Sequence, residues 1–115
     1  MEDKLIELLE SFGYPVIRQG SLAESEPYPD NFFTFWNNDS SDGSHYDNEA
    51  ASSVYDYDVN FYSNSPDNTY GKLREAIKLL KGEGFIISGD GYDVASDEDT
   101  HTGRGVNALY LKKER

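Results

Sequence analysis

The stretch SVYDYDVNFY, residues 53–62, alternates apolar with polar side chains and decides the fold of this chain. Successive side chains of a β-strand point to opposite faces of the sheet. The stretch therefore predicts a strand with one buried face and one solvated face. The buried face is expected to hold Tyr55, Tyr57, Val59 and Phe61, and the solvated face Asp56, Asp58 and Asn60.

A second strand is expected just upstream, at residues 32–36 (FFTFW), where aromatic and β-branched residues are concentrated. The polar segment between the two strands is longer than the roughly two to five residues of an ordinary hairpin loop. We therefore expect a long hairpin with a functional or mobile arm.

Two amphipathic helices flank this hairpin in the sequence. Residues 2–12 place apolar side chains at helical spacing, and Gly13 ends the run. Ser65 followed by Pro66 predicts the start of a second helix through a capping hydroxyl, and Gly82 predicts its end. The buried stripe of this helix is expected to be Tyr70, Leu73, Ala76, Ile77 and Leu80.

Shorter apolar runs complete the pattern. We expect a brief strand at residues 16–17, another at residues 85–88 and a final strand at residues 104–113. In the final strand, Val106, Ala108 and Tyr110 share one face, and Leu109 and Leu111 share the other. This pattern predicts that both faces of the strand are covered. The order α-β-β-β-α-β-β predicts one α+β domain over residues 1–115, with a mixed or antiparallel sheet and a long hairpin packed by two helices.

The chain is strongly acidic, with 10 Lys plus Arg against 22 Asp plus Glu and a formal charge of -12. Such a charge repels a phosphate backbone, so we expect no direct nucleic-acid binding. The absence of cysteine excludes disulfides and thiolate metal sites. Short apolar runs and an acidic N-terminus predict a cytoplasmic product with no membrane association.

Residues 38–49 (NDSSDGSHYDNE) nearly match a calcium-binding loop, with Gly43 sixth and Glu49 twelfth. The first ligand, however, is the neutral Asn38, and His45 stands where such loops place an aliphatic residue. The flanks are strand patterns rather than helices, and Asn, Asp and Ser side chains also cap turns. We therefore expect no dedicated metal site here, and adventitious cation binding remains open.

Catalytic motifs are absent: the sequence has no Gly-x-Ser-x-Gly, Walker or dinucleotide-binding pattern. Asp56 and Asp58 share a strand face and could act as an acid-base pair, although the alternation of a half-buried strand already explains them. We predict no enzyme activity, no catalytic residue and no cofactor.

Positive charge gathers at Arg74, Lys78 and Lys81, which follow one another at spacings of four and three on the second helix. One interpretation is an interface on which this basic face meets the acidic face of another copy. The other is a solvated helix face with Glu75 as a local partner.

A series of short motifs follows the predicted elements: GYPV at 13–16, FWN at 35–37, HYDNE at 45–49, DVNFYS at 58–63, GF at 84–85, GYDV at 91–94 and HTGRG at 101–105. In this order, and together with the pattern of elements, they resemble small proteins of tailed-phage and prophage tail modules. The resemblance is to the tail-terminator or tail-completion family of long-tailed phages, and it covers most of the chain.

This resemblance implies a virion structural protein that forms a ring, typically of about six copies, which caps the tail tube and joins it to the head connector. Its partners would be further copies of itself, the tail-tube protein and head-tail connector proteins, in the virion and, during assembly, in the host cytoplasm. The long loop would contact neighbours or the tube. His45 and Tyr46 in that loop thus join Arg74, Lys78 and Lys81 as candidate interface residues.

Two other functions fit the sequence less well. A monomeric acidic inhibitor or DNA mimic would bind one basic partner through a patterned stripe of carboxylates. A calcium-dependent binding module would use residues 38–49.

Overall fold

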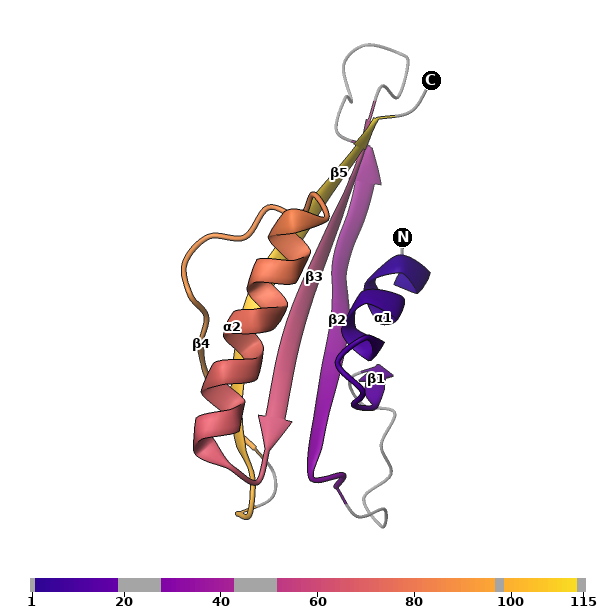
Figure 1. Cartoon of the computed structure of the whole chain (residues 1–115). Coiled ribbons are helices and arrows are strands. Elements are labelled where there is room, and N and C mark those ends of the chain that lie inside the picture. Colours follow the sequence, from indigo (N-terminus) through magenta and orange to yellow (C-terminus); the bar gives the residue numbers. More distant parts are fainter. Residues whose placement is uncertain (1, 19–27, 43–51, 97–98, 114–115) are drawn as a thin grey trace.

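A computed structural model shows a five-stranded sheet with both helices packed on one of its faces (Figure 1). The structure describes residues 2–18, 28–42, 52–96 and 99–113. The expected α+β class and the element order α-β-β-β-α-β-β are confirmed. The elements are α1 (Glu2–Glu10), β1 (Val16–Arg18), β2 (Asn31–Asp42), β3 (Ser52–Ser63), α2 (Pro66–Gly82), β4 (Tyr92–Val94) and β5 (Thr102–Lys113).

The sheet has the strand order β1-β2-β3-β5-β4. Its centre is made of β2, β3 and β5, each of 12 residues, with β3 antiparallel to both neighbours. The two edge strands are only 3 residues long, β1 being parallel to β2 and β4 antiparallel to β5. The long central strands make the molecule 50 Å long and 28 Å by 22 Å across. Their ends nearest the C-terminus project beyond both helices (Figure 1).

The core lies between the helices and one face of the sheet. As the alternation of β3 predicts, Tyr57, Val59 and Phe61 are buried, while Tyr55 packs half-buried against the same core. Burying aliphatic and aromatic side chains of this size stabilises a fold by roughly 1.5–3 kcal/mol each. The neighbouring strands add Phe33, Phe35, Val106 and Ala108, and the helices add Leu5, Leu9, Leu73, Ala76, Ile77 and Leu80.

The first helix ends at Glu10, two residues short of the expected end. The amide N–H of Gly13, which has a φ of +86°, donates to the carbonyl of Glu10 and closes the turn. Phe12 still packs on Phe33, with ring centroids 5.6 Å apart. Neither helix in the described part of the chain is long and apolar enough to cross a bilayer.

The start of α2 differs from the expected capping. Pro66 does occupy the first turn, but the hydroxyl of Ser65 makes no capping hydrogen bond. The hydroxyl of Ser63 takes its place, because it accepts a hydrogen bond from the Ser65 amide at 3.0 Å and donates to Asn31 Oδ1 at 2.6 Å. The helix start is therefore tied to the beginning of β2.

The end of α2 is set by Gly84 rather than by Gly82. Gly84 has a φ of +100°, its N–H donates to the Lys81 carbonyl, and the N–H of Phe85 reaches back to the Leu80 carbonyl. This pair of hydrogen bonds is the Schellman arrangement, which requires a left-handed residue at this position. Gly82 lies inside the helix and needs no such freedom.

The expected buried stripe of α2 is correct except for Tyr70. That side chain is 48% exposed, whereas Leu73, Ala76, Ile77 and Leu80 are buried. Tyr70 instead lies beneath the guanidinium group of Arg104, 4.8 Å from its ring centroid. Helical periodicity could not separate Tyr70 from the stripe, because the position borders both faces of the helix.

The region between α2 and β5 corrects two further expectations. Residues 85–88 form only an isolated bridge, Ile86 to Leu109, and the strand lies instead at β4, between the two expected strands. Phe85 and Ile87 are buried on the core side, which explains their strand-like pattern. The second face of β5 is not fully covered either, since Leu111 is 47% exposed.

The sheet face opposite the helices relies on glycine in β5. A Cβ on Gly105 would collide with Asn60, and one on Gly103 would collide with Tyr62 and Val94. Side chains of β3 therefore lie across β5, and Asn60 is only 7% exposed although no helix covers this face.

We predict opposite effects for alanine at the two glycines that end α2. Gly84→Ala should destabilise the protein by about 1–2 kcal/mol, because alanine is strained at positive φ. Gly82→Ala, the matched control, should be neutral or stabilise it by up to about 1 kcal/mol, because alanine is the better helix former. Urea unfolding measures both variants. Equal effects, or a larger loss for Gly82→Ala, would contradict this helix end.

Candidate functional site

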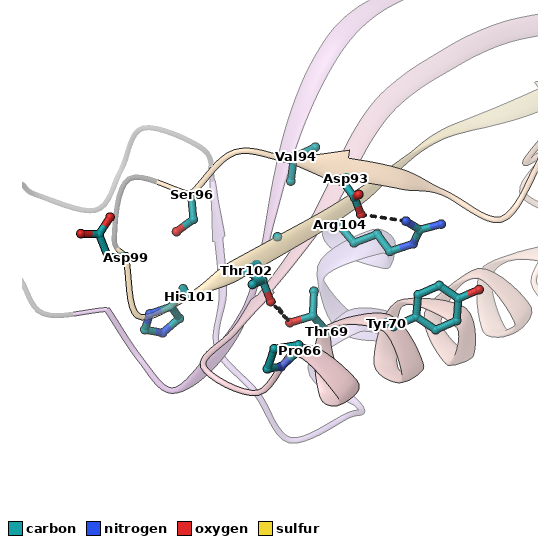
Figure 2. Close-up of a pocket in the computed structure, with 11 residues that line it drawn as sticks. Pro66, Thr69, Tyr70, Asp93, Val94, Ser96, Asp99, His101, Thr102 and Arg104 are labelled. Atoms are coloured by element: carbon teal, nitrogen blue, oxygen red, sulfur yellow. Dashed lines mark hydrogen bonds and ion pairs between the residues drawn. The ribbon is translucent and has the colours of Figure 1, made fainter.

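A polar hollow lies where the N-terminal turn of α2 meets β4 and the start of β5 (Figure 2). Its volume is about 540 Å³. Figure 2 shows Thr69 and Tyr70 rising from the helix toward Thr102 and Arg104 on β5, with Asp93 reaching across from β4. The hollow is lined by Pro66, Thr69, Tyr70, Asp93, Val94, Ser96, Asp99, His101, Thr102, Gly103 and Arg104.

Arg104 is the basic residue of this hollow, and it is engaged in three contacts. Its guanidinium group pairs with Asp93 at 2.9 Å, donates to the Gly91 carbonyl at 3.1 Å and covers the ring of Tyr70. The side chain is 16% exposed, and its Nε is buried without a hydrogen-bond partner. Arg104 therefore fastens β4 and α2 to β5 with its charge already compensated, which makes it a poor anion-binding group.

The polar groups at the other end of the hollow are also paired. The hydroxyls of Thr69 and Thr102 lie 2.8 Å apart. Nε2 of His101 lies 2.8 Å from the Pro29 carbonyl, and because a carbonyl only accepts, this nitrogen carries the proton. Nδ1 is then the acceptor for the Thr100 hydroxyl, 2.8 Å away. His101 thus joins the start of β5 to the segment before β2.

The carboxylates of β3 are held together from β5. Nδ2 of Asn107 donates to Asp56 Oδ1 at 2.6 Å and lies 3.2 Å from Asp58 Oδ1. An acid-base pair needs a reactive partner within reach, and here the same amide joins both groups. Within the described ranges, no three His, Cys, Asp or Glu side chains gather as metal ligands.

Among the residues that the structure describes, three ionisable groups have shifted pKa values. Burial, helped by the charge of Asp58, raises the pKa of Tyr92. Burial is also the main cause of the raised pKa of Tyr57, with a smaller contribution from Glu2. The hydrogen bond with Glu75 raises the pKa of Lys72. These shifts keep both phenols neutral and Lys72 charged, so none of them produces a base near neutral pH.

The calcium-like stretch begins inside a strand. Residues 38–42 belong to β2, with an irregularity of register between Asn37 and Asp39, and Nδ2 of Asn38 donates to Asp56 Oδ1 at 3.2 Å. A calcium loop would instead curl its first ligands around the ion. The rest of the stretch, including the interface candidates His45 and Tyr46, lies outside the described residues.

The basic residues of α2 do come together. Arg74, Lys78 and Lys81 are exposed and line one shallow hollow of about 490 Å³, which Asp90 borders from the segment leading to β4. The expected local partner, Glu75, pairs instead with Lys72 at 3.1 Å. Among the described residues, none of the three basic side chains forms an ion pair. We call Arg74, Lys78 and Lys81 the basic triplet.

Sequence reasoning missed an acidic counterpart on α1. Asp3, Glu7 and Glu10 are exposed on the side of the helix away from the buried Leu5 and Leu9. Their spacing of four and three equals that of the basic triplet. The sequence held this signal, but a polar face on an amphipathic helix has no meaning until the fold places it relative to a partner. We call these residues the acidic triplet.

Several large apolar side chains are exposed away from both triplets. They include Trp36, Ile86, Tyr92 and Leu111, each between 46% and 56% exposed. Aromatic residues are enriched in protein interfaces.

No protein-family model matches this chain, and no curated protein matches it either. The function is therefore argued from the geometry described above and from the motifs of the sequence.

Arg104 and Asp93 offer a test of whether the polar hollow is structural. Arg104→Ala should destabilise the fold by roughly 2 kcal/mol, because it removes packing and charge contacts made by a largely buried side chain. Asp93→Ala should cost under about 1 kcal/mol, because the Asp93 side chain is 93% exposed and its ion pair with Arg104 is screened by solvent. Thermal unfolding monitored by circular dichroism compares the two. An unchanged melting temperature for Arg104→Ala would argue that Arg104 is kept for binding instead.

Proposed function

We propose that this protein is a structural subunit of a tailed phage or prophage, which assembles into a ring that terminates the tail tube and joins it to the head connector. The proposal rests on the resemblance to tail-terminator proteins, and one observation carries it. Three exposed basic side chains line a single hollow without ion-pair partners in the described chain, on a protein with a formal charge of -12.

Charge of this kind favours association between copies. Copies that carry the same net charge repel one another at long range, yet opposite charges placed on different faces attract at short range and fix the orientation of contact. A basic triplet on an acidic protein is such a face. Another copy of the same chain supplies the complementary negative charge, since the chain has 22 Asp plus Glu.

The acidity also suits a passage for DNA. A lumen that transmits DNA should not retain it, and negative charge lowers the affinity for phosphates. We expect no DNA binding at moderate salt in a fluorescence polarisation assay. Specific binding there would contradict a DNA-conducting role.

Mass measurement by size-exclusion chromatography with light scattering tests the assembly directly. We expect the purified protein to form a closed oligomer, in the range of about six copies, visible as rings in negative stain. A strict monomer at every concentration would remove the ring and favour the alternative, an acidic inhibitor of a basic partner.

A matched pair of charge reversals locates the contact. Lys78→Glu should weaken association by about tenfold, equivalent to about 1.4 kcal/mol, because it places a carboxylate within the basic triplet. Lys72→Glu makes the same charge change on the same helix but affects a lysine that already pairs with Glu75. The association constant of this variant should stay within about twofold of that of the unmodified protein. Equal losses would show that net charge alone matters.

A further inference from the structure

The sheet has two open edges at the end that projects beyond the helices. On the β2 side, residues 39–42 lie past β1, which pairs only with Phe33–Phe35. On the β5 side, residues 110–113 lie past both β4 and the bridge at Leu109. Each stretch pairs with β3 and, within the described chain, with no other strand. Open edges of this kind are templates for adding a strand from another chain.

The two edges match in direction and in level. Because β2 and β5 are both antiparallel to β3, they run the same way. The register places Asp42 opposite Ser53 and Ser53 opposite Lys112, so residues 40–42 of the β2 edge lie level with residues 110–112 of the β5 edge. A copy rotated about an axis along the strands would therefore bring its β5 edge beside the β2 edge of the first, as a parallel pair and without an axial shift. A contact of this kind is head-to-tail, and without an axial shift it generates a ring when the rotation between copies divides a full turn.

Charge in the sequence favours this pairing over a two-fold dimer. The β2 edge carries Asp39 and Asp42, and the β5 edge ends in Lys112 and Lys113. Two β2 edges facing each other would bring acidic residues together, and like charges opposite each other destabilise a strand pair. The pairing of β2 with β5 brings opposite charges together instead.

The helices repeat the same complementarity. The acidic triplet lies on α1, which contacts β1 at one edge of the sheet, and the basic triplet lies on α2, which packs above β3 and β5 (Figure 1). The hollow of the basic triplet is bordered by Asp90, on the segment that leads to β4, so this face of α2 is turned toward the β4 edge. In a head-to-tail contact, the outer side of α2 approaches α1 of the next copy.

The helix directions also agree. In Figure 1, α1 and α2 run in opposite directions, and in a ring the α2 of one copy would run opposite to the α1 of the next. In this antiparallel arrangement the two triplets follow the order Arg74 with Glu10, Lys78 with Glu7 and Lys81 with Asp3. In both triplets the first and last residues lie seven positions apart, so the outer pairs can match together while the central pair is offset by one residue, about 1.5 Å along the axis.

We propose that copies of this chain join head-to-tail, with β5 residues 110–113 added in parallel to β2 residues 39–42 of the next copy and the basic triplet of α2 placed against the acidic triplet of its α1. This inference rests on the proposed ring and specifies its interface. Backbone hydrogen bonds supply the contact at the sheet, and the triplets set its orientation and exclude a two-fold arrangement.

A pair of complementary variants tests the triplets. Arg74→Glu/Lys78→Glu makes both helix faces acidic, and Glu7→Lys/Glu10→Lys makes both basic; Glu and Lys have similar helix propensity, so both helices should persist in circular dichroism. Each variant alone should associate at least about tenfold more weakly than the unmodified protein. An equimolar mixture should regain the ring mass, with the two variants alternating. Loss in both variants without recovery in the mixture would overturn the pairing of the triplets.

Hydrogen exchange read by mass spectrometry tests the sheet edges. Amides in residues 39–42 and 110–113 that exchange quickly in the dissociated variants should be protected in the unmodified ring, while Trp36 and Asn37, which pair with β3, provide an internal reference. Unchanged exchange at both edges in a ring of the unmodified protein would overturn the strand pairing and leave the proposed function standing. An unmodified protein that stays monomeric would overturn the proposed function and this interface with it.

Discussion

The burial of one face of β3 is the constraint on which the rest of the structure depends. Tyr57, Val59 and Phe61 are nearly solvent-free, and they lie between β2 and β5 beneath both helices. A shift of one residue in register would move this set to the solvated face and place Asp56 and Asp58 in the core. The register of both neighbouring strands, and through it the position of every side chain considered above, follows from this alternation.

The polar hollow beside α2 is explained by the same architecture. The 3-residue strand β4 and the start of α2 need attachment to β5, and Arg104, Thr69 and His101 provide it through ion-pair, hydroxyl and imidazole contacts. Groups that are already paired with one another are not available for a substrate without losing those contacts. These contacts attach β4 and α2 to β5, and the exposed basic triplet of α2 takes no part in them.

The length mismatch between strands and helices gives this fold its exposed features. The three strands of 12 residues extend beyond the helix layer and the short edge strands. Two backbone edges and apolar side chains such as Leu111 are therefore in contact with solvent. Monomeric proteins normally shorten, cover or charge such edges to prevent association. In the proposed ring, each of these open edges is covered by the edge of the neighbouring copy.

The sequence by itself determined the α+β class, the order of the elements, the inward face of β3 and the buried stripe of α2 from Leu73 to Leu80, because each depends on local periodicity that only one backbone conformation satisfies. It also indicated the basic triplet, which needs only helical spacing. It could not place the strand at Tyr92–Val94, the exposure of Tyr70, or the use of Gly84 instead of Gly82, because these depend on Arg104, Phe85 and Leu109 approaching from other elements. Tertiary structure alone decided that the acidic and basic triplets lie over different strands on the same face of the sheet. The strand order sets the separation of α1 from α2, and no local sequence pattern determines it.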